Sequence, residues 1–361
     1  MSILRPTLTF RYLAKHYIIN FIALLMGISL AFSMIDYFQH SEQLALSSNY
    51  KILYVYYMWQ EALVLLYPLA LIFALIMTKL SFVKSSNMVI FYSFGYTKRE
   101  LFYPFLVVST VVYLLFTYLH TTQFSYAKDK AKAMLAQEGV DSYSLKDLFF
   151  IYNGTFVYAK NIDPIKKKME DLVLFSLDGN NLKYTIDAKE AYFTGNGWLA
   201  KDILIHNLIY DKSSNLVRYE IEKRDEMLTL IGYEPKIIES IQEGKALNMT
   251  DSFRALKLLD KQKLNTHKLR SKIYYKIIFP LFSIPLLLIL FFKIPFHARY
   301  MNLAFVLAIS LGITFLVWGV LFAFNQMGQN GVIKPEFAIP LPISILWLYA
   351  LFVFFNNSER L

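Results

Sequence analysis

The residues of this sequence that could carry out chemistry are few, and their spacing matches no catalytic pattern. Six histidines are scattered along the chain, and none belongs to a His-Glu-x-x-His motif or to another metal-binding spacing. Cysteine is absent, which excludes thiolate metal sites and cysteine nucleophiles. A nucleophile elbow and a Walker A motif are also absent, and Gly328-Gln-Asn-Gly331 lacks the strand and helix that flank a phosphate-binding loop. We therefore predict no catalytic residue, metal site or cofactor in this chain, so that any ATP is used by a partner.

Two acidic residues in or beside apolar segments remain as candidates. Glu61 follows Gln60 about ten residues into an apolar segment, and an ionisable group at bilayer depth is costly enough to indicate a functional site. At the membrane interface the same carboxylate costs little, so both interpretations stay open. Asp36 lies at the end of the first apolar segment. With His40 and Glu42 it forms the one compact polar group that a membrane enzyme could use.

Six apolar segments position these residues. An apolar run of about 20 residues matches the hydrocarbon thickness of a bilayer and predicts a membrane-spanning helix. The composition agrees, because 56% hydrophobic and 18% charged residues are typical of a membrane protein with one extramembrane domain. Pro340 and Pro342 indicate the start of the last helix, where proline costs little. The predicted spans are Tyr17–Ile35, Ile52–Met77, Leu101–Leu119, Ile273–Phe292, Leu303–Phe324 and Ala338–Phe355.

The distribution of basic residues predicts the orientation of these spans. Lys and Arg gather before the first span and in alternate loops, whereas the opposite loops are balanced in charge. The positive-inside rule then predicts that both termini are cytoplasmic and that residues 121–270 lie in a bacterial periplasm. The net charge of +10 therefore indicates membrane topology rather than nucleic-acid binding. No cleavable signal peptide is expected. The basic residues counted on the cytoplasmic side are Arg5, Arg11, Lys15, Lys79, Lys84, Lys98, Arg99, Lys293 and Arg299.

The segment between the third and fourth spans is predicted to be an all-β domain. Short stretches rich in Val, Ile, Tyr and Phe alternate with turn sequences at 178–181, 195–197 and 212–215. Several short antiparallel strands favour a sandwich, a jelly roll or an open barrel. Charged helices over Tyr126–Gln137 and Ser252–Lys272 are expected to connect it to the spans. The predicted strands are Thr155–Ile162, Asp171–Phe175, Lys183–Phe193, Trp198–Ile209 and Leu216–Leu230.

The cytoplasmic loop between the second and third spans is predicted to hold a short helix over about 82–96. Ser85 or Ser86 could cap its start, and Gly95 could close it. Such a helix could lie in the membrane interface or insert into a groove on a separate ATPase, and the residues leave both uses open. Its predicted apolar face is formed by Met88, Val89, Phe91 and Tyr92.

Five short segments occur in a fixed order within a layout of three spans in 1–120, a periplasmic domain in 121–270 and three spans in 271–361. The segments are Tyr12-Leu-Ala-Lys15, Tyr67-Pro68-Leu-Ala70, Ser86–Thr97, Ser271-Lys-Ile273 with Pro280, and Gly331-Val-Ile-Lys-Pro335. No single segment is specific, but together they are. In this order and layout the chain resembles the LptF/LptG family of lipopolysaccharide-export permeases over essentially its whole length, and LptG more than LptF.

The resemblance implies a non-catalytic subunit of an ATP-binding-cassette exporter. Its implied partners are an LptF-like permease subunit, a dimer of the LptB-like ATPase that uses ATP and Mg²⁺, and LptC-like and LptA-like periplasmic proteins. Lipopolysaccharide would leave the inner membrane and pass along periplasmic jelly rolls, one of them formed by this chain. The implied ATPase-coupling residues are Ser86, Asn87, Met88, Val89, Phe91, Tyr92 and Gly95. The implied lipid-binding residues are Asp36, Lys51, Tyr57, Glu61, Lys272 and Lys276.

Two departures from the family pattern change these expectations. Asn87 occupies a position where the family usually has Glu, which removes one possible ion pair with the ATPase. Asp36 and Glu61 align with positions where some relatives carry basic residues that could face lipid A phosphates. We expect either a lipid A with fewer or amine-modified phosphates, or cations supplied by the partner subunit or by the lysines named above. The alternatives to an exporter are a membrane enzyme and a tethering protein with a periplasmic β-domain.

Overall fold

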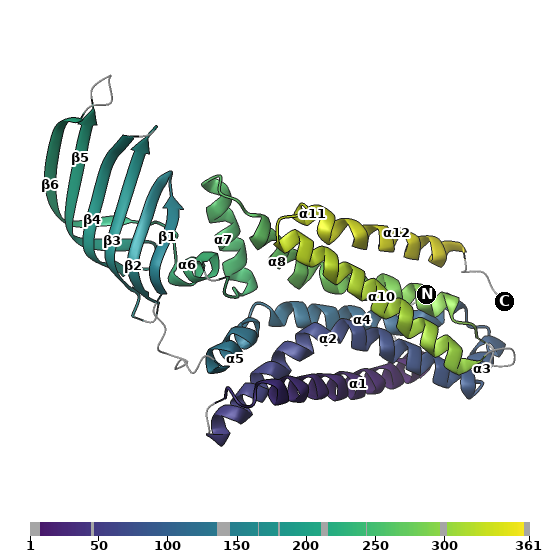
Figure 1. The fold of residues 1–361 in the computed structure, drawn as a ribbon. Coiled ribbons are helices and arrows are strands. Elements are labelled where there is room, and N and C mark those ends of the chain that lie inside the picture. The colour runs from purple at the N-terminus through teal and green to yellow at the C-terminus, as the bar shows by residue number, and fades with distance from the viewer. Residues whose placement is uncertain are drawn as a thin grey trace. The chain divides into compact units, whose positions relative to one another are not determined.

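A computed structural model describes residues 8–44, 47–135, 145–164, 166–179, 181–210, 216–242, 244–296 and 302–356. The chain divides into two compact units. The helical unit combines the described residues within Met1–Glu42, Ser47–Lys128 and His267–Leu361, and the β unit comprises those within Gln43–Leu46 and Asp129–Thr266. Figure 1 labels their elements.

Five helices of the helical unit are long and apolar enough to cross a membrane, and a bent pair adds a sixth candidate. Their lengths match or exceed the predicted spans, because several helices continue past the hydrocarbon layer. Pro340 begins the last helix, as predicted. The five are α1 (Leu8–His40), α2 (Ser48–Lys84), α4 (Lys98–Leu119), α10 (Leu303–Gln329), and α12 (Pro340–Asn356) with the short α11 (Pro335–Ala338) before it.

The fourth predicted span is not one straight helix. It consists of α8 (His267–Ile277), a 3-10 turn η2 (Phe279–Phe282) and α9 (Ser283–Lys293), with a bend of 44° between α8 and the rest. Pro280 lies in the first turn of η2 and has no backbone N–H to continue the ladder of α8. The expected connector Ser252–Lys272 is likewise two helices, α7 (Met249–Lys261) and α8, and Lys263 between them has a φ of 56°.

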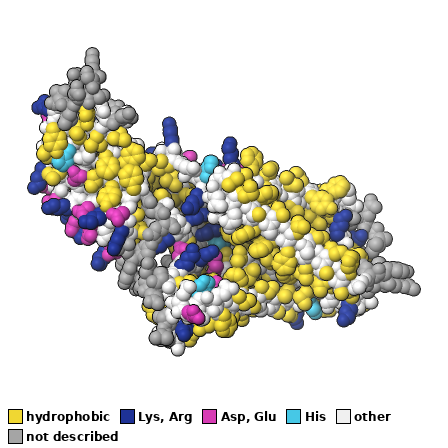
Figure 2. All heavy atoms as spheres, in the orientation of Figure 1, with side chains coloured by type: hydrophobic (Ala, Val, Ile, Leu, Met, Phe, Trp, Pro, Cys, Tyr) yellow, Lys and Arg dark blue, Asp and Glu magenta, His cyan; other side chains and the backbone are white. Residues whose placement is uncertain are grey.

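Helices α1 and α2 are joined by hydrogen bonds between side chains and to the backbone along their length. In an apolar medium such bonds hold helices in one register, because an unpaired polar group cannot form a hydrogen bond with water there. The remaining face of α1 and most of α10 expose apolar side chains, which Figure 2 shows across the visible face of the helical unit. The bonds are Asn20 Nδ2 to Thr78 Oγ1 (2.7 Å), the Tyr17 hydroxyl to the Leu71 carbonyl (3.0 Å), and Trp59 Nε1 to Ser29 Oγ (2.9 Å).

The β unit contains one six-stranded antiparallel sheet in which each strand pairs with its neighbour in sequence. The prediction of an all-β domain is confirmed, whereas the connectivity of the described strands is a meander without the crossing connection of a jelly roll. Strand β1 was missed by the sequence patterns. The turn at 212–215 and part of that at 178–181 lie outside the described residues. The strands are β1 (Leu145–Tyr152), β2 (Thr155–Asp163), β3 (Lys168–Asp178), β4 (Asn181–Phe193), β5 (Trp198–Tyr210) and β6 (Leu216–Thr229).

One face of this sheet forms the core of the β unit. Alternate residues such as Leu148, Ala159 and Leu172 follow one another across the strands by their pairing and are buried. Trp198 is fully buried, and its indole Nε1 donates to the Tyr233 carbonyl at 2.7 Å. The Tyr233 hydroxyl donates to the Ile151 carbonyl at 2.8 Å. Helices α6 (Pro235–Gln242) and α7 follow Tyr233 in the chain, and α5 (Ala127–Leu135) precedes the sheet.

Tyr233 predicts how the β unit responds to alkaline pH. Burial raises the pKa of Tyr233 to about 12, so the folded unit favours the neutral phenol. This contribution to stability is complete below the unfolded-state pKa of about 10 and is lost as the pH rises toward 12. We expect the sheet of the full chain to melt at a lower temperature at pH 11 than at pH 8, followed by amide I infrared absorption. Tyr233→Phe is expected to reduce this difference, and an unchanged difference would contradict the assignment.

Candidate coupling site

The loop between α2 and α4 forms a short helix closed by glycine. Helix α3 covers Asn87–Ser93, which is narrower than the predicted 82–96. Gly95 has a φ of 79°, and the Gly95 and Tyr96 amides donate to the Tyr92 and Phe91 carbonyls, so the predicted glycine stop is confirmed. Ser86 precedes the helix with a φ of 59° and makes no side-chain capping bond, so the predicted serine cap is wrong. A left-handed Ser86 turns the chain sharply after α2 instead.

The apolar side chains of α3 divide between the protein and the surface. Met88 is fully buried, and Tyr92 contacts Phe296 edge-on with ring centroids 5.0 Å apart. These residues of the predicted face therefore hold α3 against its own chain. Val89, Ile90 and Phe94 are exposed, Phe94 to 75%. Sequence reasoning missed Ile90 and Phe94, although their spacing of four places them on one helix face.

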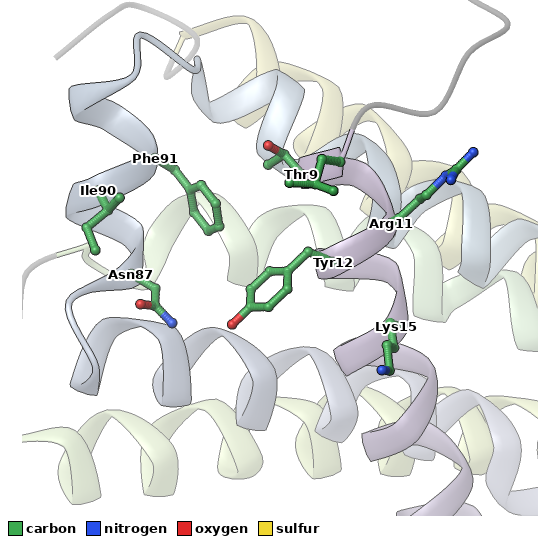
Figure 3. Close-up of a pocket in the computed structure, with 8 residues that line it drawn as sticks. Thr9, Arg11, Tyr12, Lys15, Asn87, Ile90 and Phe91 are labelled. Atoms are coloured by element: carbon green, nitrogen blue, oxygen red, sulfur yellow. The ribbon is translucent and has the colours of Figure 1, made fainter.

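Helix α3 and the beginning of α1 enclose an open pocket of about 480 Å³. Figure 3 shows Tyr12, Asn87 and Phe91 pointing into the space between the two helices. The rings of Tyr12 and Phe82 of α2 stack with their centroids 5.7 Å apart. The Thr9 hydroxyl donates to the Tyr96 hydroxyl at 2.9 Å, so α1 is bonded to the loop that contains α3. The lining residues are Leu8, Thr9, Arg11, Tyr12, Lys15, Asn87, Ile90 and Phe91.

Lys79 lies in the same part of the helical unit and is not a loop residue. The distribution of basic residues predicts that it is a cation of the cytoplasmic loop, but it belongs to α2 and is fully buried. Its ammonium group donates to the carbonyls of Phe291 and Ile294 and lies 4.0 Å from the centre of the Phe296 ring. It therefore satisfies carbonyls at the end of α9, where a cation also complements the helix dipole. Lys79 links the helix that leads into α3 to the fourth span.

The acidic lipid-binding candidates have partners inside the chain. Asp36 accepts a hydrogen bond from the buried Tyr54 hydroxyl, and His40 Nδ1 lies 3.4 Å from the same carboxylate. Glu61 Oε1 lies 3.8 Å from Lys128 Nζ. Lys128 follows the end of α4, and this pairing favours the interpretation in which Glu61 lies near the membrane interface. Because both carboxylates are paired, they repel a nearby phosphate less than two isolated charges would.

The basic candidates lie at the same end of the helical unit as Asp36 and Glu61. Lys51 and Tyr57 are half-buried in the first turns of α2, and Lys272 and Lys276 are half-buried on α8. Burial and the charge of Lys276 lower the pKa of His120 to about 4, so this histidine adds no charge at neutral pH. These candidates are thus far along the helices from α3, and the two predicted sets of site residues occupy opposite ends of the unit.

Helices α8, α10 and α11 meet at a tight junction beside these lysines. A Cβ atom at Gly328 of α10 would lie 2.8 Å from Ala338 Cβ and 3.3 Å from Ser271 Oγ, so only glycine allows this approach. Arg270 donates to Glu336 at 2.5 Å across the same junction. Among the described residues, no group of three His, Cys, Asp or Glu side chains could hold a metal ion.

The family profile for the lipopolysaccharide export system permease LptF/LptG matches residues 11–356. The chain belongs to the LptF/LptG family. It is therefore a lipopolysaccharide export permease rather than an enzyme, and a multi-pass protein of the inner membrane. No curated protein matches the chain. The LptF/LptG match extends over both units and includes α3, the glycine junction and all the lining residues of the pocket except Leu8 and Thr9.

Proposed function

We propose that this chain is the LptG-like subunit of an ATP-binding-cassette lipopolysaccharide exporter, with both termini cytoplasmic and the β unit periplasmic. Its partners would be an LptF-like permease, a dimer of an LptB-like ATPase that binds ATP and Mg²⁺, and LptC-like and LptA-like periplasmic proteins. The observation that carries the proposal is α3, a short helix that leaves Val89 and Phe94 uncovered while Met88 fixes it to the spans. Exposed apolar side chains on an anchored helix are typical of a helix that inserts into a groove of a partner, and not of a loop that stays in water.

The structure also supports a route for force from α3 into the spans. Helix α3 contacts the fourth span's end through Tyr92 and Phe296, and Lys79 ties the end of α9 to α2. A push on α3 would therefore reach α9 through packed side chains rather than through a flexible loop. We propose that this motion changes the lipid-facing helices and expels lipopolysaccharide toward the β unit. Asp36, Lys51, Tyr57, Glu61, Lys272 and Lys276 would meet the lipid headgroup at the opposite end.

The exposed face of α3 gives a direct test of this function. We expect Phe94→Asp to lower the amount of ATPase that co-purifies with the chain and its LptF-like partner in mild detergent by about tenfold or more, because a buried Phe contributes about 1.5–3 kcal/mol. Ser93→Asp adds the same charge at the neighbouring exposed position and serves as the matched control. Equal recovery of the ATPase with Phe94→Asp and with the unchanged chain would refute the coupling role of α3.

A further inference from the structure

The pocket between α1 and α3 carries positive charge that no acidic residue in the described part of the chain neutralises. Arg11 and Lys15 are exposed on α1 at a spacing of four, which places them on one helix face with Leu8. Neither makes an ion pair with a described residue, although the exposed acid Glu100 begins the nearby α4. That carboxylate is occupied by a capping box, in which it accepts from the Thr97 amide at 2.8 Å. Within the described ranges, the two cations of the pocket therefore have no carboxylate partner.

The remaining walls of the pocket are apolar. Leu8 is 88% exposed and Ile90 is 49% exposed. The rings of Phe91 and Tyr12 also line the pocket (Figure 3). Asn87 adds one amide that can donate a hydrogen bond. A simple inorganic anion would use the cations but would leave these apolar walls in water. A ligand that satisfies both surfaces has an anionic head and a hydrocarbon part.

The location of the pocket indicates which ligand with an anionic head and a hydrocarbon part can reach it. The pocket lies at the first turns of α1, a helix that is long and apolar enough to span the membrane. The end of a spanning helix lies at the membrane interface in either orientation of the chain, so lipid headgroups surround it. Basic pockets at such helix ends bind anionic lipid headgroups, and each cation adds about fivefold to the affinity.

We propose that this pocket binds one anionic phospholipid, with the phosphate at Arg11 and Lys15, the headgroup against Asn87, and an acyl chain along Leu8 and Ile90. The lipid bridges α1 and α3, two elements that otherwise meet here through the edge-on contact of the Tyr12 and Phe91 rings, whose centroids are 6.4 Å apart. A bound lipid therefore restrains α3 relative to the spans. This site shares Asn87, Ile90 and Phe91 with the candidate coupling site. Lipid binding needs no partner subunit, so it can be tested independently of the proposed function.

The test uses the full chain purified in detergent, without partners. Binding of the first phosphatidylglycerol is measured by native mass spectrometry, and hydrogen exchange of residues 87–93 reports its location. We expect Arg11→Gln with Lys15→Gln to raise the half-saturating phosphatidylglycerol concentration about thirtyfold. Phosphatidylglycerol is expected to slow the exchange of α3 in the unchanged chain and not in this double variant. Arg11→Lys is expected to bind within about fivefold of the unchanged chain, because it keeps the charge.

Matched controls separate this site from general attraction between charges. Lys84→Gln with Lys293→Gln removes the same charge at exposed positions outside the pocket and is expected to bind as the unchanged chain does. Phosphatidylcholine and soluble glycerol phosphate are expected not to slow the exchange of α3. Unchanged binding by the Arg11 and Lys15 double variant overturns the proposal. So does equal weakening by the control pair, or protection of α3 by glycerol phosphate, which would indicate a site for a free phosphate.

Discussion

Replacing Gly328 with alanine is expected to destabilise the helical unit by about 1–3 kcal/mol. The new Cβ atom would lie 2.8 Å from Ala338 Cβ and 3.3 Å from Ser271 Oγ, and neither neighbour is the flexible end of a long side chain. Either α10 must move from α8 and α11 or the side chains must leave their preferred rotamers, and overpacking of this kind costs about that much. Thermal unfolding of the detergent-purified chain measures the effect.

Gly312 on the same helix provides the opposite expectation. A Cβ atom there would meet nothing within 4 Å. Gly312→Ala should therefore stabilise the chain by up to about 1 kcal/mol, because alanine loses less backbone entropy than glycine in a helix. The two substitutions add the same methyl group to α10, so a difference in sign isolates packing at the junction. Equal unfolding temperatures for both variants would show that the junction is not close-packed.

The second large effect is expected at Lys79. Lys79→Met keeps the length and apolar stem of the side chain but removes the donor to the Phe291 and Ile294 carbonyls. Two buried carbonyls at the end of α9 would then lack this partner, and each unsatisfied group costs about 1–3 kcal/mol. We expect a loss of about 2–5 kcal/mol, observed as a lower unfolding temperature and poorer recovery of folded chain from detergent.

A control for Lys79 is available five residues further along the same sequence. Lys84 is the last residue of α2 and is exposed, and Lys84→Met removes the same charge without removing a buried bond. Its unfolding temperature is expected to stay within the range of ordinary surface substitutions, about 0.5 kcal/mol. If Lys79→Met unfolds no earlier than Lys84→Met, the link between α2 and the end of α9 contributes nothing measurable to stability.

The sequence predicted most of what depends on neighbouring residues. Apolar runs long enough for a bilayer predicted the spans, alternation and turn residues predicted five of the six strands, and Gly95 predicted the end of α3. These features follow from local propensity and from the period of the hydrophobic pattern. Pro280 lies within the fourth predicted span, which was expected to be continuous, because proline alone does not say whether a helix ends, bends or begins there.

What only the tertiary structure decided is which groups meet. From the sequence Lys79 is predicted to be a loop cation, because Lys is usually exposed. Only the packing of α9 against α2 places backbone carbonyls beside it. The ion pair of Glu61 with Lys128 and the division of α3 into a packed side and an exposed side likewise depend on helices distant in sequence. So does the pocket in which Arg11 and Lys15 pair with none of the described carboxylates. The physical reason is that spacing along a helix fixes the face on which a side chain lies, whereas the partner of that face is set by how separate helices pack.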